Sequence, residues 1–135
     1  MQMNGEDLLT LEQESFDLVM SSIFLHELSS KSLPKVVKEG FRVLSPGGLM
    51  LHLEQPQYDD KMPVYEQYMR DWDSYNNNEP FWSAMHEIDL DELLKDLGFA
   101  PENISHAALR AGDFDMANEE HGRAPAWHAY VAKKT

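Results

Sequence analysis

The chain has 135 residues, of which 42% are hydrophobic, a composition that suits one domain with a buried core. Its formal net charge of −13 disfavours binding to the phosphates of nucleic acids. The absence of cysteine excludes disulfides and thiolate metal sites and fits a cytoplasmic protein, and no apolar run in the sequence is long enough to cross a membrane.

Residues 1–15 are acidic and only weakly periodic. We expect them to form an N-terminal arm that is loosely held against the rest of the domain. Glu6 and Asp7 are the first acidic residues of this arm.

The next forty residues predict a strand, a crossover helix and a second, parallel strand. Phe16–Ser22 is a nearly continuous apolar run, typical of a strand buried on both faces. Residues 33–44 have helical period, and Ser32 is placed to cap the first turn. The Ser-Pro-Gly-Gly sequence at 45–48 predicts a turn, and residues 49–53 predict the second strand.

Polar side chains stand where these two strands end. Ser21 and Ser22 close the first strand and Glu54 closes the second, and ligands of open α/β sheets bind at this edge. His26 follows in the next loop and has two open interpretations: a general base, because its ring titrates near neutral pH, or a ring packed between its leucine neighbours. Glu54 is either a group that orients a substrate or a solvated carboxylate.

An unusually aromatic segment, residues 55–87, separates this unit from the C-terminal part. Helical spacing predicts helices at 63–75 and 81–86. The rings either form the core of a helical hairpin or line an apolar pocket that attracts a sulfonium or ammonium cation. These rings belong to Tyr58, Tyr65, Tyr68, Trp72, Tyr75, Phe81 and Trp82.

The C-terminal part predicts one helix and two strands. Asp89 is a good N-cap for a helix over 89–97, and Gly98 suits the left-handed position that ends it. Residues 104–110 and 127–132 predict strands, separated by a loop at 111–125. The histidines of this half show no metal-ligand spacing, and we predict no metal site.

Three short motifs occur in order: Phe16-Asp17-Leu18-Val19, Leu25-His26-Glu27-Leu28, and Arg42-Val43-Leu44-Ser45-Pro46-Gly47-Gly48. Together they resemble the middle of a class I SAM-dependent methyltransferase. The resemblance implies a partial Rossmann-like α/β fold with strands in the order 4-5-7-6 of the family's numbering, flanking helices and a helical aromatic insert. It also implies that residues 1–135 are one domain, with an arm at 1–15 and a lid-like insert at 55–87.

The resemblance further implies a cofactor, S-adenosyl-L-methionine (SAM), and a small-molecule methyl acceptor. It gives the acidic arm a place beside the adenine and the first strand end a place beside the reactive methyl group. The cofactor-binding residues that it implies are Glu6, Asp7, Ser21, Ser22 and Leu25. The candidates on the acceptor side are His26 and Glu54 for catalysis and Tyr58 and Tyr65 for binding.

The family's Gly-rich cofactor loop and the acidic residue after its second strand have no counterpart here. We therefore expect the C-terminal part of a methyltransferase domain that binds SAM weakly or not at all and is inactive alone. The alternatives are a non-catalytic binding or assembly module derived from such an enzyme, or an unrelated small α/β protein. The strand Phe16–Ser22 would then be a bare edge that pairs with another copy, is capped by residues 1–15, or aggregates.

Overall fold

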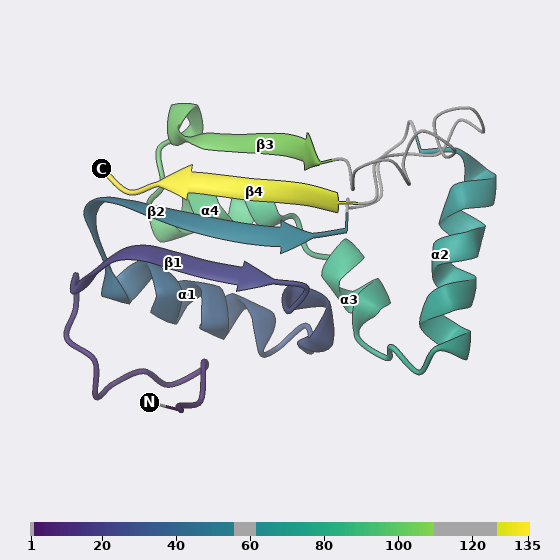
Figure 1. Ribbon diagram of the computed structural model, residues 1–135, viewed down its shortest axis with the longest axis horizontal. Coiled ribbons are helices and arrows are strands. Elements are labelled where there is room, and N and C mark those ends of the chain that lie inside the picture. The colour runs from purple at the N-terminus through teal and green to yellow at the C-terminus, as the bar shows by residue number, and fades with distance from the viewer. Residues whose placement is uncertain (1, 56–61, 110–126) are drawn as a thin grey trace.

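A four-stranded mixed sheet is the centre of the molecule, and helices connect its strands (Figure 1). The computed structural model describes residues 2–55, 62–109 and 127–135. In chain order, the elements are β1 (Phe16–Ser22), the 3₁₀-helix η1 (Leu25–Glu27), α1 (Leu33–Val43), β2 (Leu44–Glu54), α2 (Val64–Asn76), α3 (Trp82–His86), α4 (Leu90–Leu97), the 3₁₀-helix η2 (Pro101–Asn103), β3 (Ile104–Leu109) and β4 (Trp127–Lys133).

The strands lie in the order β1-β2-β4-β3. β1 and β2 are parallel and are joined through α1, as the sequence predicts, because parallel neighbours need a long crossover. β4 is antiparallel to both β2 and β3. This arrangement confirms the predicted order 4-5-7-6, with β1 at one edge of the sheet.

β2 begins earlier than predicted, because residues 45–48 belong to the strand instead of forming a separate turn. Gly47 has a φ of +83°, a value that glycine adopts without strain. Its amide donates to the carbonyl of Lys134, and the amide of Lys134 donates to the carbonyl of Gly48. The Pro-Gly-Gly sequence therefore makes an irregularity within a paired strand.

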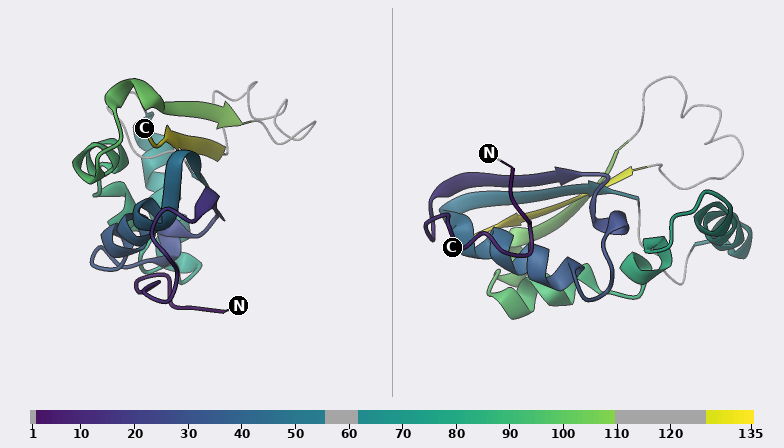
Figure 2. Two further views of the ribbon diagram at one scale, coloured as in Figure 1. Left: turned by 90° about the vertical axis from the view of Figure 1, so that its left-hand side faces the viewer. Right: turned by 90° about the horizontal axis from the view of Figure 1, so that it is seen from below.

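The helices of the described residues cover one face of the sheet, as the right-hand view of Figure 2 shows. α1 and α4 pack there, and alternate residues of the strands point into the core between them. The fully or nearly buried side chains of this core are Leu25, Leu33, Val37, Leu44, Met50, Met85, Leu90, Leu94, Phe99, Tyr130 and Ala132.

The prediction that Phe16–Ser22 is buried on both faces is wrong for this chain. Leu18 is 52% and Met20 62% exposed. They alternate with Val19, which packs against the core, so they lie on the opposite face of the strand. Leu49 of β2 pairs with Leu18 and is exposed on the same face. An apolar run thus predicts a strand correctly but does not show that both of its faces are covered.

The N-terminal arm packs beside α1 and not along the free edge of β1. The amide of Leu8 donates to Glu39 at 2.9 Å, and the guanidinium of Arg42 donates to the carbonyls of Leu8 and Leu11. The hydrogen bond from Arg42 holds the pKa of Glu39 below its usual value. Of the three alternatives for the β1 edge, capping by residues 1–15 is therefore wrong.

The predicted helix ends are partly confirmed. The Asp89 carboxylate accepts from the amide of Glu92 at 3.0 Å, and Gly98 ends α4 with a φ of +111°. Ser32 does precede α1, but its side chain makes no capping hydrogen bond. Its hydroxyl instead accepts from the Ser29 hydroxyl at 2.9 Å.

The aromatic insert does form helices, but the rings of α2 do not make a hydrophobic core. Tyr65, Tyr68 and Tyr75 are all more than half exposed, and Trp72 is 48% exposed. The periodicity therefore predicted the helix correctly, and of the two open interpretations of its rings, the packed core is wrong for those of α2. Trp82 of α3 is the ring of this segment that contacts another functional candidate, as described below.

We expect Gly48→Ala to destabilise the fold by about 1–3 kcal/mol, the usual cost of overpacking. A Cβ at Gly48 would lie 2.9 Å from the Ser45 carbonyl oxygen and 3.0 Å from that of Asp17, and backbone atoms cannot move aside cheaply. Gly5→Ala is the matched control, since its Cβ meets only Val36 at an ordinary 3.6 Å. Urea denaturation of both variants measures the difference; equal stabilities would contradict the expectation.

Candidate functional site

The carboxyl ends of β1 and β2 meet at one edge of the sheet because the two strands are parallel. Immediately after β1, Ile23 has a φ of +51°, a left-handed conformation that is costly for a β-branched residue. Its amide donates to the Leu53 carbonyl at 2.8 Å, which holds it there. This turn directs the amides of Phe24 and Leu25 toward the end of β2.

Glu54, the last residue of β2, is fully buried at this point. Its Oε1 accepts from the amide of Phe24 at 2.7 Å and from that of Leu25 at 2.6 Å. Its Oε2 lies 2.8 Å from Nδ1 of His26. A buried carboxylate is tolerated only with such partners, so the interpretation of Glu54 as a solvated group is wrong.

The pair fixes the chemistry of the His26 ring. A carboxylate oxygen only accepts, so Nδ1 is the nitrogen that carries hydrogen, and in the neutral ring Nε2 carries the lone pair. His26 is 6% exposed, and its Nε2 lies 3.6 Å from a carboxylate oxygen of Glu27. A histidine oriented by a buried carboxylate is a suitable proton acceptor.

α3 places two further rings beside His26. The ring of Trp82 lies 5.6 Å from that of His26, and its indole Nε1 is buried without a hydrogen-bond partner in the described part of the chain. Burial, followed by the nearby Arg70 cation, lowers the pKa of His86 to about 4, so that this ring is neutral near pH 7. Arg70 itself donates to Gln55 and Glu66, both at 2.8 Å.

Sequence reasoning named His26 and Glu54 separately but missed their contact, and it gave no role to His86 or Arg70. The two partners are 28 residues apart, so no local pattern links them. The family resemblance, which places the ends of two neighbouring parallel strands at one edge, is the signal that could have predicted their contact. The neighbouring rings of α3 could not be placed from periodicity, because a five-residue helix gives too little pattern.

The other predicted residues lie around this centre in different ways. The Ser21 hydroxyl is 2.7 Å from Nδ1 of His52, Ser22 is exposed, and the side chain of Leu25 lies in the core. Tyr65 is exposed on α2, and Tyr58 lies outside the described residues.

The acidic arm residues are engaged locally. Glu6 lies 3.1 Å from Nζ of Lys35, and hydrogen bonds from Ser32 and Lys35 hold its pKa below the usual value. Asp7 accepts from the amide of Leu9 at 3.2 Å. The structure thus brings Glu6 to the start of α1.

One group of side chains in the described residues could hold a metal ion. His26, Glu27 and Glu79 each offer one ligand atom, and these atoms lie within 4.8 Å of one another. A metal there would occupy Nε2 of His26 and so would compete with its use as a proton acceptor.

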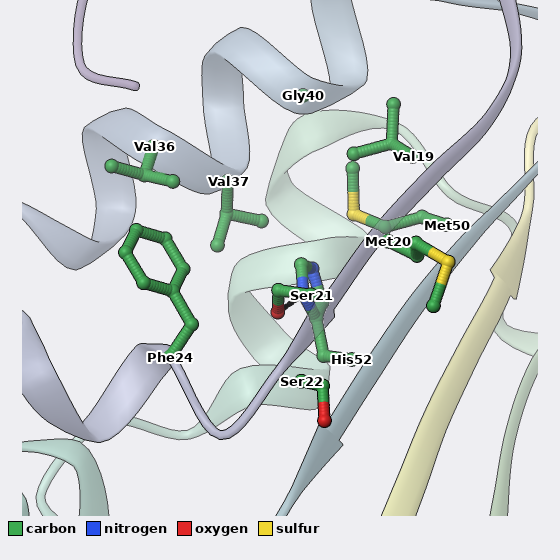
Figure 3. A pocket seen from close by; sticks show the side chains of 10 residues that line it. All are labelled: Val19, Met20, Ser21, Ser22, Phe24, Val36, Val37, Gly40, Met50 and His52. Carbon is green, nitrogen blue, oxygen red and sulfur yellow. Dashed lines mark hydrogen bonds between the residues drawn. The ribbon is translucent and has the colours of Figure 1, made fainter. Parts of the chain in front are cut away.

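A cavity of about 290 Å³ lies between β1 and α1, on the helix side of the sheet (Figure 3). Figure 3 shows Phe24 and Val37 on one side of it, Val19 and Met50 on the other, and His52 beside Ser21 in the middle. Burial lowers the pKa of His52 to about 4, and its Nε2 has no hydrogen-bond partner among the described residues. Neither His26 nor Glu54 lines this cavity.

The comparisons with known proteins concern the fold of the chain. Residues 1–52 match the family model described as a methyltransferase domain. No curated protein sequence matches the chain. No helix among the described residues combines the length and apolar character that a membrane crossing requires.

Solved structures of methyltransferases share the fold. An O-methyltransferase family protein from Burkholderia thailandensis is similar with a TM-score of 0.64 and 17% identity, over 100% of this chain and 35% of that one. A SAM-dependent methyltransferase from Archaeoglobus fulgidus has a TM-score of 0.61 and 15% identity, over 98% of this chain and 66% of that one. A SAM-bound phosphoethanolamine N-methyltransferase from Haemonchus contortus has a TM-score of 0.58 and 14% identity, over 92% of this chain and 34% of that one. The chain therefore spans between about one third and two thirds of their lengths.

Proposed function

We propose that this chain, which has a class I SAM-dependent methyltransferase-like fold, supplies the acceptor side of a methyltransferase site. In the complete enzyme, His26 would take the proton of a small-molecule acceptor, and Glu54 would orient the ring. The buried pair of His26 and Glu54, 2.8 Å apart where β1 and β2 end, carries the proposal. The candidate residues of the first strand end, Ser21 and Ser22, lie at the same edge.

The ring of Trp82 beside His26 supports a place for the sulfonium of SAM there. SAM, when bound, supplies a methyl group on a positively charged sulfur, which needs alignment more than acid–base chemistry. The face of an indole ring attracts such a cation, and Trp82 lies beside His26 with an unpartnered Nε1 among the described residues. Glu6 and Asp7 would have to exchange their local bonds to reach an adenine amino group.

Each residue of the pair has its own role. With SAM bound, Nε2 of His26 would accept the proton that the acceptor hydroxyl or amine loses. The acceptor's lone pair would bond to the methyl carbon while the bond between that carbon and the sulfur breaks, and S-adenosylhomocysteine would leave. The carboxylate of Glu54 stabilises the imidazolium that results, while the amides of Phe24 and Leu25 keep that carboxylate in place. The exposed Tyr65 and the undescribed Tyr58 are our candidates for contact with the acceptor.

A thermal-shift titration with SAM and S-adenosylhomocysteine tests the cofactor part. We expect little or no change in the melting temperature of the 135-residue chain, because it lacks a Gly-rich cofactor loop. Clear, saturable stabilisation would contradict the proposal that the chain alone binds SAM weakly.

A longer polypeptide that carries this chain behind a Gly-rich cofactor loop tests the catalytic part. We expect it to bind SAM and to transfer the labelled methyl group, and we expect His26→Gln to lower the transfer rate by about 10²–10⁴-fold with unchanged SAM binding. Transfer that His26→Gln leaves intact would overturn the role of His26.

A non-catalytic assembly module is the second candidate function. Among the described residues, the outer edge of β1 is unpaired and one apolar face is exposed, which favours it because such surfaces invite association.

A further inference from the structure

Two hydrogen-bond acceptors face one another beside the pair of His26 and Glu54. Nδ1 of His26 donates to Glu54, so Nε2 of the neutral ring presents its lone pair. Oε1 of Glu27 lies 3.6 Å from that Nε2, a distance too long for a hydrogen bond. The side chain of His26 is only 8% exposed. A buried lone pair therefore faces a carboxylate, and a bound cation would satisfy both groups.

Glu79 brings a second carboxylate to the same point from the aromatic insert. It precedes α3, whose Trp82 ring lies 5.6 Å from the ring of His26. The Glu79 carbonyl accepts from the amide of Trp82 at 3.2 Å and from the hydroxyl of Ser74 at 2.9 Å. Its backbone is thus held between α2 and α3, and a carboxylate oxygen of Glu79 lies within 4.8 Å of the ligand atoms of His26 and Glu27.

The support behind His26 is of the kind that metal ligands have. A histidine that binds a metal through one ring nitrogen usually donates its other N–H to a carboxylate or a carbonyl. Nδ1 of His26 lies 2.8 Å from Oε2 of the fully buried Glu54, and two backbone amides donate to Oε1 of that carboxylate. The ring is therefore fixed with Nε2 toward Glu27, whose side chain is 56% exposed and leaves a way in for an ion.

We propose that Nε2 of His26 and the carboxylates of Glu27 and Glu79 bind one Zn²⁺ ion. Three protein ligands with a fourth position open are typical of accessible zinc sites, and an imidazole ligand favours zinc over Mg²⁺ and Ca²⁺, which prefer oxygen. Ligand atoms about 2.1 Å from a tetrahedral zinc are about 3.4 Å apart. Nε2 and Oε1 of Glu27 are 3.6 Å apart, so a shift of the carboxylates on the order of 1 Å completes the set.

A zinc ion here would link two parts of the fold. Its ligands come from η1 and from the loop before α3, so it would fasten the helical insert to the end of β1. It would also take the lone pair that the proposed function gives to a proton, so zinc binding and proton acceptance by His26 exclude one another. The inference rests on the geometry of the three side chains and not on the proposed function, and its tests measure metal binding and not methyl transfer.

Calorimetric titration of the chelator-treated 135-residue chain with ZnCl₂ is the first test. We expect one saturable ion per chain, and a dissociation constant raised about tenfold or more by Glu79→Gln and by Glu27→Gln, because each removes a ligand. MgCl₂ should bind more weakly by a similar factor.

Two control variants should leave zinc binding unchanged. Glu102→Gln removes an exposed carboxylate on η2, and His106→Gln removes another histidine that lies beside a carboxylate, 2.7 Å from Asp91. Absence of zinc binding, an equal affinity for Mg²⁺, or zinc binding that Glu79→Gln or Glu27→Gln leaves intact would overturn the proposal.

Long-range ¹H–¹⁵N correlation spectra of the imidazole rings locate the ion on the unaltered chain and need no folded variant. The rings are assigned through bonds to the labelled backbone. We expect ZnCl₂ to shift the Nε2 resonance of His26, while Nδ1 keeps the hydrogen that it donates to Glu54. Zinc that shifts the resonances of other rings and leaves those of His26 in place would contradict the site.

Discussion

Glu54→Ala is expected to lower the free energy of unfolding by about 4 kcal/mol, because it removes a buried carboxylate that accepts from three donors. The amides of Phe24 and Leu25 and Nδ1 of His26 would all lose their acceptor. A small domain is stable by about 5–15 kcal/mol, so the loss would be a large fraction of the total. Urea denaturation at neutral pH measures it.

Two further variants separate this effect from a general loss of charge. Glu54→Gln keeps one carbonyl oxygen as an acceptor and should cost clearly less than Glu54→Ala. Glu102→Ala removes an exposed carboxylate and should change stability by no more than about 0.5 kcal/mol. If Glu54→Ala were as mild as Glu102→Ala, the three hydrogen bonds to Glu54 would not exist in solution.

Stability is expected to fall as the pH is lowered from about 6.5 toward 4, because His52 must be neutral in the folded protein. Burial lowers its pKa to about 4, whereas a histidine in the unfolded chain has a pKa of about 6.5. Between these values the unfolded state binds more protons, so its free energy falls relative to that of the folded state. The full contribution, on the order of 3 kcal/mol, is present above pH 6.5 and is lost by about pH 4.

His52→Leu should flatten the pH dependence between 6.5 and 5, a window above the titration of ordinary carboxylates. His86 acts in the same direction, since its pKa is also lowered to about 4. The double variant His52→Leu/His86→Leu should therefore show the flattest profile, measured as the urea midpoint against pH. An unchanged slope in the double variant would mean that neither ring is kept neutral by the fold.

Local signals were sufficient where one short stretch determines an element. Asp89 and Gly98 predicted both ends of α4, and the spacing of the apolar runs predicted the parallel pair β1 and β2 with its crossover helix. The order of all four strands came from the family resemblance of Phe16 to Gly48 and is confirmed.

Predictions of burial were weaker, because burial depends on what covers a surface. The apolar residues of β1 predicted a strand covered on both faces, but in the described part of the chain the helices lie on one face and leave Leu18 and Met20 exposed. The aromatic stripe of α2 left a packed core and a pocket open as alternatives, and the exposure of Tyr65 and Tyr75 contradicts the packed core. Periodicity reports the conformation of a segment and not the presence of a neighbour.

The candidate site illustrates the same limit for contacts. His26 and Glu54 were each predicted from their positions at strand ends, and their roles remained open because neither residue had a partner in view. The left-handed turn at Ile23 brings them together, and no sequence pattern announces such a turn at a β-branched residue. The hydrogen bond between them favours the proton-accepting interpretation of His26 over simple packing.

The central claim is that Glu54 holds His26 in one tautomer and leaves Nε2 free to take a proton. Long-range ¹H–¹⁵N correlation spectra of the imidazole rings test it directly, with the His26 signals assigned by their loss in His26→Gln. We expect the neutral ring to carry its hydrogen on Nδ1, with an unprotonated Nε2, and we expect this preference to disappear in Glu54→Ala. A neutral His26 ring that carries its hydrogen on Nε2 would contradict the account.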